Sequence, residues 1–271
     1  MVESKYINEN LQKRVLKINY NTSIETVNKF SLKKIFKFLK TLVSFFIELV
    51  FHRPNLIYYT IPPTGIGLYK DIPYILLLKV LQIHPIFHLH GKGIYENVFN
   101  SSFKRGLHQF IYSNSSIIHL SHNLLELEIL RLDIKKSNYY VVNNGIKYNT
   151  ISSSYLKERN DIQVLFLSNL LISKGILMAF EIIKKLRDET NIKFKFNIVG
   201  EFKDEMTKKI VMKYVDSNNL SDVSQFHGAR YGKDKFKILN KMDVLLYPSF
   251  NDAFPLVILE ALQSGLPVIA S

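Results

Sequence analysis

The stretch "IQVLFLSNLLISKGILMAFEIIKKLRDE", residues 162–189, decides the fold class. Its first part is a short apolar run that ends near Ser168, which is typical of a buried strand. Apolar residues recur at helical spacing after Gly175. The stretch therefore predicts a strand over 162–170, a loop, and a helix over 175–189.

The same pattern of strand, loop and helix recurs along the chain. Further strands are predicted over 55–61, 84–93, 116–121, 139–145, 194–200, 223–228 and 243–249, and further helices over 31–51, 70–82, 204–217 and 232–241. This alternation predicts an α/β protein with parallel sheets that carry helices on both faces. The polar stretch 143–161 separates two such sets, so we expect domains over 1–150 and 151–271.

Composition limits the classes of function. The chain has 271 residues and no cysteine, which excludes disulfides, thiolate metal sites and a cysteine nucleophile. Its net charge of +13 favours anionic partners. Nucleic acid is not favoured among them, because lysines are spread along the whole chain and no recognised binding motif is present. The polar start indicates no secretory signal, and the apolar segment 38–51 is too short to span a membrane.

Two acidic residues stand near the last predicted helix. The strand over 243–249 leads into a loop with Asp252, and the helix starts near Pro255, so Glu260 lies about two turns inside it. The backbone N–H groups of Phe254, Leu256 and Val257 lack helical partners, so an anion or a sugar hydroxyl can bind there. The simpler interpretation is that Asp252 caps the helix and Glu260 is solvated.

Three other loops carry suggestive residues. Lys174 beside a helix N-terminus suits a phosphate, although Lys-Gly pairs are common at solvated loop ends. His88 and His90 share a face of one predicted strand, so one of them can act as a base, bind a metal together with His84, or belong to the core. The segment "PPTGIG", residues 62–67, is predicted as a turn and is a weak phosphate motif.

The predicted helix over 31–51 carries Lys33, Lys34, Lys37 and Lys40 in its first half. Two interpretations remain open for it. The helix packs on the core with a solvated basic edge, or it faces a membrane.

Read together, these loops resemble those of the family-4 retaining glycosyltransferases of the GT-B fold, of the bacterial polysaccharide-assembly type. "FPLVILEALQSGLPVIAS" is similar to the family's Glu-x7-Glu region, with Asp252 and Glu260 in the acidic positions. "LSNLLISKGI", "FNIVGEF", "DVLLYPSFND", "NNGI", "PNLIYYTIPPTGIGLYKD" and "IFHLHGKG" resemble other family segments. The resemblance covers about residues 15–271.

The resemblance implies two Rossmann-like domains that face a cleft, the C-terminal one incomplete. It implies transfer of a sugar from a nucleotide-diphosphate-sugar to an acceptor hydroxyl with retention, and no metal cofactor. The residues that it implicates are His90 and Asp252 in catalysis, Lys174, Ser168, Asn169, Phe254, Pro255, Leu256 and Glu260 in donor binding, and Gly91 and Lys92 on the acceptor side.

The implied partners are a nucleotide sugar, a glycan or lipid-linked acceptor and an anionic membrane surface, with no nucleic acid. We expect a cytoplasmic protein that is peripheral at the inner face of the cell membrane. No glycine-rich loop precedes "VLKINYN" and the chain ends at "PVIAS", so we expect truncation at both ends. The alternatives are a non-catalytic fragment that binds nucleotide sugar or an assembly partner, and another GT-B enzyme such as a nucleotide-sugar epimerase.

Overall fold

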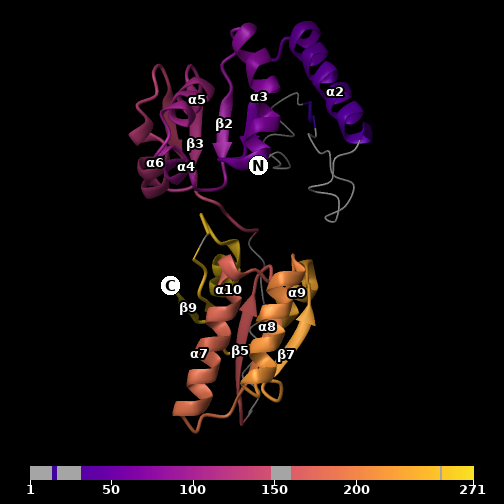
Figure 1. Cartoon of the computed structure of the whole chain (residues 1–271), viewed down its shortest axis with the longest axis vertical. Coiled ribbons are helices and arrows are strands. Elements are labelled where there is room, and N and C mark those ends of the chain that lie inside the picture. The colour runs from indigo at the N-terminus through magenta and orange to yellow at the C-terminus, as the bar shows by residue number, and fades with distance from the viewer. Residues whose placement is uncertain (1–13, 17–31, 148–159, 251) are drawn as a thin grey trace. The chain divides into compact units, whose positions relative to one another are not determined.

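The computed structural model describes residues 14–16, 32–147, 160–250 and 252–271 (Figure 1). The chain divides into two compact units, and each contains a sheet of its own. The predicted boundary between residues 150 and 151 falls outside the described residues and stays a prediction. The prediction of parallel sheets is confirmed, as the strand pairs below show.

The N-terminal sheet has the order β1-β2-β3-β4, and β1, β2 and β3 pair in parallel. Its strands are β1 (Tyr58–Ile61), β2 (Ile86–Leu89), β3 (Ser116–His119) and β4 (Asn138–Val141). The helical elements of this half are α2 (Leu32–Ile47), a π-helical turn η2 (Glu48–His52), α3 (Gly65–Val80), α4 (Ile94–Val98), α5 (Ser102–Tyr112), α6 (His122–Glu128) and a 3-10 turn η3 (Leu130–Leu132).

Helix α3 begins five residues earlier than the sequence predicts, so the turn expected over 62–67 is wrong in its second half. The N-cap residue is Thr64, in an extended conformation, and the helix starts at Gly65. A Cβ atom added at Gly67 would lie 3.0 Å from Cγ of Pro62, which is a tight contact. Two glycines with low helix propensity belong to the first turn of this helix, which is why the sequence pattern places its start too late.

The C-terminal sheet has the order β7-β6-β5-β8-β9, and all four neighbouring pairs are parallel. The strands are β5 (Ile162–Leu167), β6 (Phe194–Val199), β7 (Ser224–Gly228), β8 (Val244–Tyr247) and β9 (Val268–Ala270). The helical elements are a 3-10 turn η4 (Ile172–Lys174), α7 (Ile176–Glu189), α8 (Glu205–Ser217), α9 (Gly232–Leu239) and α10 (Leu256–Gln263).

Alternate residues of β5 define the two faces of this sheet. Val164 and Phe166 pack with α7 and α8, whereas Leu165 and Leu167 pack with α9 and α10. Helices therefore cover both faces, as predicted. Because β6 and β8 flank β5 in parallel, the carboxyl ends of these three strands meet at one edge, where open parallel sheets bind ligands.

Helix α2 packs on α3 through aromatic contacts. The rings of Phe38 and Phe45 lie 5.8 and 5.3 Å from the ring of Tyr74, which is fully buried. Of the helices in the described ranges, none has both the length and the hydropathy that a bilayer crossing requires.

Candidate functional site

The loop after β5 lies directly against the end of β8. Gly175 has a φ of +79°, and a Cβ atom at this position would lie 1.7 Å from the carbonyl oxygen of Pro248. Real Cβ atoms do not come so close, so only glycine fits between the two backbones. This contact positions Lys174, the residue before Gly175, at the carboxyl edge of the sheet.

The loop after β6 is held to the same edge. A Cβ atom at Gly200 would lie 1.9 Å from the carbonyl oxygen of Ser168, and the N–H of Leu170 donates to the carbonyl of Glu201 at 3.0 Å. Ser168 is half-buried directly after β5, whereas Asn169 is exposed. Both residues therefore lie where the sequence predicts them, in the loop at the end of the central strand.

Lys174 and Asp252 form an ion pair across this edge. The Lys174 Nζ atom lies 2.6 Å from Asp252 Oδ2, and the side chains are 22% and 24% exposed. Such exposure leaves the pair accessible to a ligand, yet shields it from water more than a surface pair. The interpretation of Asp252 as a helix cap is not supported, because the N-cap of α10 is Pro255, whose side chain accepts no hydrogen bond.

Glu260 is not solvated either. Its Oε1 atom lies 2.5 Å from Nζ of Lys235, and its side chain is 13% exposed. Lys235 comes from α9, and sequence reasoning missed it because its contact with Glu260 depends on how α9 and α10 pack. Phe254, Pro255 and Leu256 form the entry to α10 between the two acids, as expected.

Tyr247, the last residue of β8, is a further polar group at this site that the sequence analysis missed. Its hydroxyl donates to Oδ2 of Asp252. Burial raises the pKa of Tyr247, and the hydrogen bond to the Asp252 carboxylate raises it further. The signal in the sequence was a tyrosine at the carboxyl end of an apolar strand, where its hydroxyl reaches the ligand edge.

The N-terminal candidates follow β2. That strand ends at Leu89, so the prediction that His88 and His90 lie on one strand is wrong. His88 is buried and its Nδ1 atom hydrogen-bonds with the hydroxyl of Tyr58, so it belongs to the core. His90 is exposed in the loop after the strand, and Gly91 and Lys92 continue that loop.

Glu128 closes the N-terminus of α4 from within the fold. Its carboxylate accepts hydrogen bonds from the backbone N–H groups of Gly93, Ile94 and Tyr95, at 3.0, 2.5 and 3.1 Å. The residue is 7% exposed. An internal carboxylate therefore occupies the position that an anionic ligand would take after β2.

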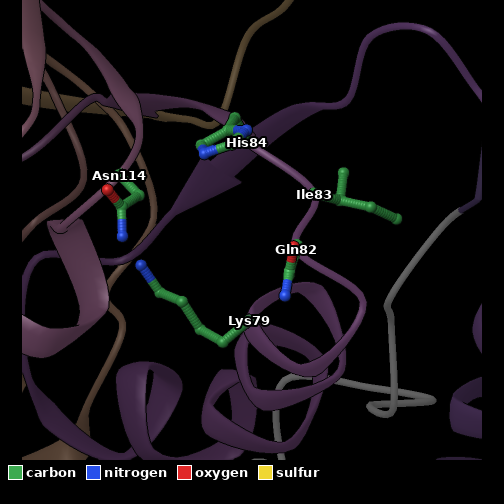
Figure 2. A pocket seen from close by; sticks show the side chains of 5 residues that line it. All are labelled: Lys79, Gln82, Ile83, His84 and Asn114. Atoms are coloured by element: carbon green, nitrogen blue, oxygen red, sulfur yellow. The ribbon is translucent and has the colours of Figure 1, made fainter.

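A pocket of about 310 Å³ lies at the other edge of the N-terminal sheet, where β2 and β3 begin (Figure 2). Lys79, Gln82, Ile83, His84 and Asn114 line it. The Lys79 amine donates to the carbonyl and the hydroxyl of Ser113, and burial lowers its pKa. Lys79 thus joins the ends of α3 and α5, and the pocket shares no residue with the predicted donor and acceptor sites.

Comparisons with known proteins bear on the family. Residues 148–271 match the family model described as "Glycosyl transferases group 1". A curated relative, the N,N'-diacetylbacillosaminyl-diphospho-undecaprenol alpha-1,3-N-acetylgalactosaminyltransferase of Campylobacter jejuni, is 26% identical over 277 residues. The match covers 94% of this chain and 67% of the relative.

Solved structures show the fold. HepE of Anabaena, crystallised with UDP and glucose, has a TM-score of 0.65 and 18% identity, over 90% of this chain and 65% of that one. The pneumococcal O-GlcNAc transferase GtfA, crystallised with UDP and GlcNAc, has a TM-score of 0.62 and 18% identity, over 85% and 44%. This chain therefore spans less than two thirds of either structure. It has the GT-B fold, and its residues 148–271 match the glycosyl transferases group 1 model.

Proposed function

We propose that this chain transfers a sugar from a UDP-sugar to a hydroxyl group of a lipid-linked glycan, with retention of configuration at the anomeric carbon. One observation carries the proposal. Asp252 and Glu260 lie around the start of α10, at the carboxyl edge of the sheet in the segment that matches the group 1 model, and each is held by a lysine. Lysines suit a diphosphate, and carboxylates suit sugar hydroxyls.

Each side chain has a role in this proposal. Glu260 accepts hydrogen bonds from the ribose, while Asp252 accepts them from the transferred sugar. Ser168, Asn169 and the backbone of Phe254, Pro255 and Leu256 complete the donor contacts. When the bond between the anomeric carbon and the diphosphate breaks, its electron pair goes to the diphosphate, and Lys174 stabilises that charge. The acceptor oxygen bonds to the anomeric carbon on the face that the diphosphate leaves, and the proton of the acceptor hydroxyl passes to the leaving diphosphate.

Donor binding is an exchange of partners. Lys174 pairs with Asp252 at 2.6 Å. The diphosphate must therefore replace Asp252 as the partner of Lys174, and the sugar hydroxyls must replace Lys174 as donors to Asp252. Both groups are more than a fifth exposed, which allows this exchange without unfolding the loop. Tyr247 keeps its hydrogen bond to Asp252 throughout and so holds the carboxylate in place.

The nature of the acceptor is proposed by analogy. The name of the Campylobacter relative specifies a sugar on diphospho-undecaprenol, which is a lipid-linked acceptor. His90, Gly91 and Lys92 follow β2 and serve the acceptor side in this proposal. Such an acceptor would place the enzyme at the cytoplasmic face of the membrane.

The test is calorimetric titration of the purified chain with UDP, GDP and ADP. We expect UDP to bind and Glu260→Ala to abolish the binding, because ribose contacts are lost. Asp234→Ala is the matched control: it removes an exposed carboxylate that pairs with Lys237 on α9, next to Lys235. Loss of binding in both variants, or no binding of any nucleotide by the folded chain, would overturn the donor site.

Turnover separates the enzyme from a binding fragment. We expect sugar release from a UDP-sugar by the chain, and faster consumption when a lipid-diphosphate glycan is added. Nucleotide binding without turnover would support the non-catalytic alternative. An epimerised nucleotide sugar formed without acceptor would support the epimerase alternative.

A further inference from the structure

Helix α2 has a second apolar face that the core does not use. Phe38, Phe45 and Leu49 follow one side of the helical segment over 32–52, and the first two pack on Tyr74. Another stripe faces solvent and consists of Leu32, Phe36, Leu39, Val43 and Phe46, which are 76, 72, 51, 57 and 43% exposed. We call these five residues the outer stripe.

The spacing of the outer stripe is 4, 3, 4 and 3 residues, so its side chains form one line along the helix. Scattered apolar residues on a surface need no explanation, but a continuous line of large ones marks an interaction site. The stripe therefore calls for a partner.

A row of lysines runs beside the stripe. Lys33, Lys37 and Lys40 are exposed, and each follows a stripe residue by one position, which places it about 100° further around the helix. Helix α2 contains no acidic residue at all. Glu48, in the turn that follows, pairs with Arg14 at 3.1 Å. The positive row thus has no counter-charge within its own helix.

We propose that the outer stripe of α2 binds the surface of an anionic lipid bilayer. A helix that lies in the interface inserts its apolar line between the lipids, and flanking lysines reach the anionic headgroups. The anionic surface supplies the charge that α2 lacks. A second copy of the chain, joined through α2, would bring only more lysines to the contact, since α2 has no acid to offer.

This proposal does not rest on the proposed sugar transfer. It concerns residues 32–46, which lie in the N-terminal half, and vesicles without glycan or nucleotide suffice to test it. Its failure would leave the donor site untouched, and a failure of nucleotide binding would leave this surface untouched.

Vesicle flotation tests the row of lysines on α2. We expect the full chain to float with vesicles that contain a third phosphatidylglycerol and not with pure phosphatidylcholine vesicles. The triple variant Lys33→Gln, Lys37→Gln and Lys40→Gln should lower the partition constant about a hundredfold. The control removes three exposed lysines from α8 instead, by Lys208→Gln, Lys209→Gln and Lys213→Gln, and should keep most of the binding. Equal losses in both variants would mean that the net charge alone attracts the chain, which would overturn the proposal.

A single tryptophan tests insertion of the stripe. The chain contains no tryptophan, so Val43→Trp gives one reporter on the outer stripe, and Met206→Trp gives a reporter at an exposed position of α8. Anionic vesicles should shift the emission of the first variant to the blue and leave the second unchanged. No shift in either variant, or a shift that follows protein concentration without vesicles and so reports self-association, would overturn the proposal.

Discussion

Glu128 and Asp71 in the N-terminal half have other kinds of partner than Asp252 and Glu260 in the C-terminal half. In the N-terminal half, Glu128 is held by backbone N–H groups and Asp71 by the hydroxyl of Tyr59. In the C-terminal half, Asp252 and Glu260 are held by lysines from other elements. The first kind of partner is neutral and fixed by the fold, whereas the second is charged and flexible.

This difference distinguishes carboxylates with a structural role from carboxylates that are free to bind a ligand. The backbone N–H groups cannot release Glu128 unless α4 unwinds. The Glu128 carboxylate is therefore not free to bind a ligand. A lysine side chain has four rotatable bonds and can turn from a carboxylate to a phosphate. We propose that the carboxylates held by lysines are the ones that a ligand reaches, and the following changes test this distinction.

The largest effect is expected for Gly175→Ala, which changes the loop that carries Lys174. The new Cβ atom would lie 1.7 Å from the carbonyl oxygen of Pro248, and the backbone has a φ of +79°. We expect a loss of more than ~3 kcal/mol in the free energy of unfolding of the C-terminal half. Gly265→Ala has a similar φ of +69° and open space around it, so it should cost only about 1–2 kcal/mol. Urea unfolding that shows equal losses would contradict the contact.

Glu128→Ala tests the carboxylate that is held by neutral backbone N–H groups. It leaves three N–H groups at the start of α4 without their acceptor, which should destabilise the N-terminal half by about 3 kcal/mol. Glu126→Ala removes an exposed carboxylate from α6, the helix that also carries Glu128, and should change the free energy of unfolding by less than ~0.5 kcal/mol. Nucleotide affinity should stay unchanged in both variants. A lowered affinity in Glu128→Ala alone would break the distinction between the two halves.

Asp71 gives a pH-dependent test. Burial raises its pKa to about 6, although its hydrogen bond with Tyr59 and the charge of Lys70 lower it. Unfolded aspartate titrates near pH 4, so the folded state binds more protons between about pH 4 and 6, and stability falls as the pH rises through that window.

Asp71→Asn cannot ionise and removes this loss. We expect the variant to be more stable than the parent above pH 6 by up to about 2 kcal/mol, with the difference vanishing near pH 4. Thermal unfolding at a series of pH values measures it. A difference that does not change with pH would show that the Asp71 carboxyl is not titrating in this window.

The smallest effect is expected for Tyr247→Phe, which removes one hydrogen bond from Asp252 and leaves the lysine in place. A lost hydrogen bond of about 1 kcal/mol corresponds to about a fivefold loss of turnover with a UDP-sugar. Tyr231→Phe, at a tyrosine that is 74% exposed, is the control. An unchanged rate would mean that Lys174 alone positions Asp252.

The sequence predicts the sheets better than it predicts the site. Apolar runs such as 162–170 mark buried strands, because a strand covered on both faces must be apolar along its length. The error at Gly65 arises because glycine disfavours helices, yet Gly65 and Gly67 lie in the first turn of α3, so propensity alone places the helix start too late.

The partners of the predicted residues could not be inferred from the sequence. Lys235 and Glu260 lie 25 positions apart, and Glu128 meets the N–H group of Ile94 across 34 positions. Such contacts depend on how helices pack against a sheet, which local patterns do not determine. The acids themselves were singled out because they flank a strand-to-helix junction, where the topology alone favours a ligand.

The strand order has a consequence for the protein while it is being made. β5 is the first strand of the C-terminal sheet to leave the ribosome, and β6 follows and pairs with it, so the middle of the sheet can form early. Asp252 is synthesised 78 residues after Lys174, which at ordinary translation rates is a delay of roughly 4–16 s. The lysine side of this ligand edge is thus made before its acidic side, and α10 and β9 follow after both.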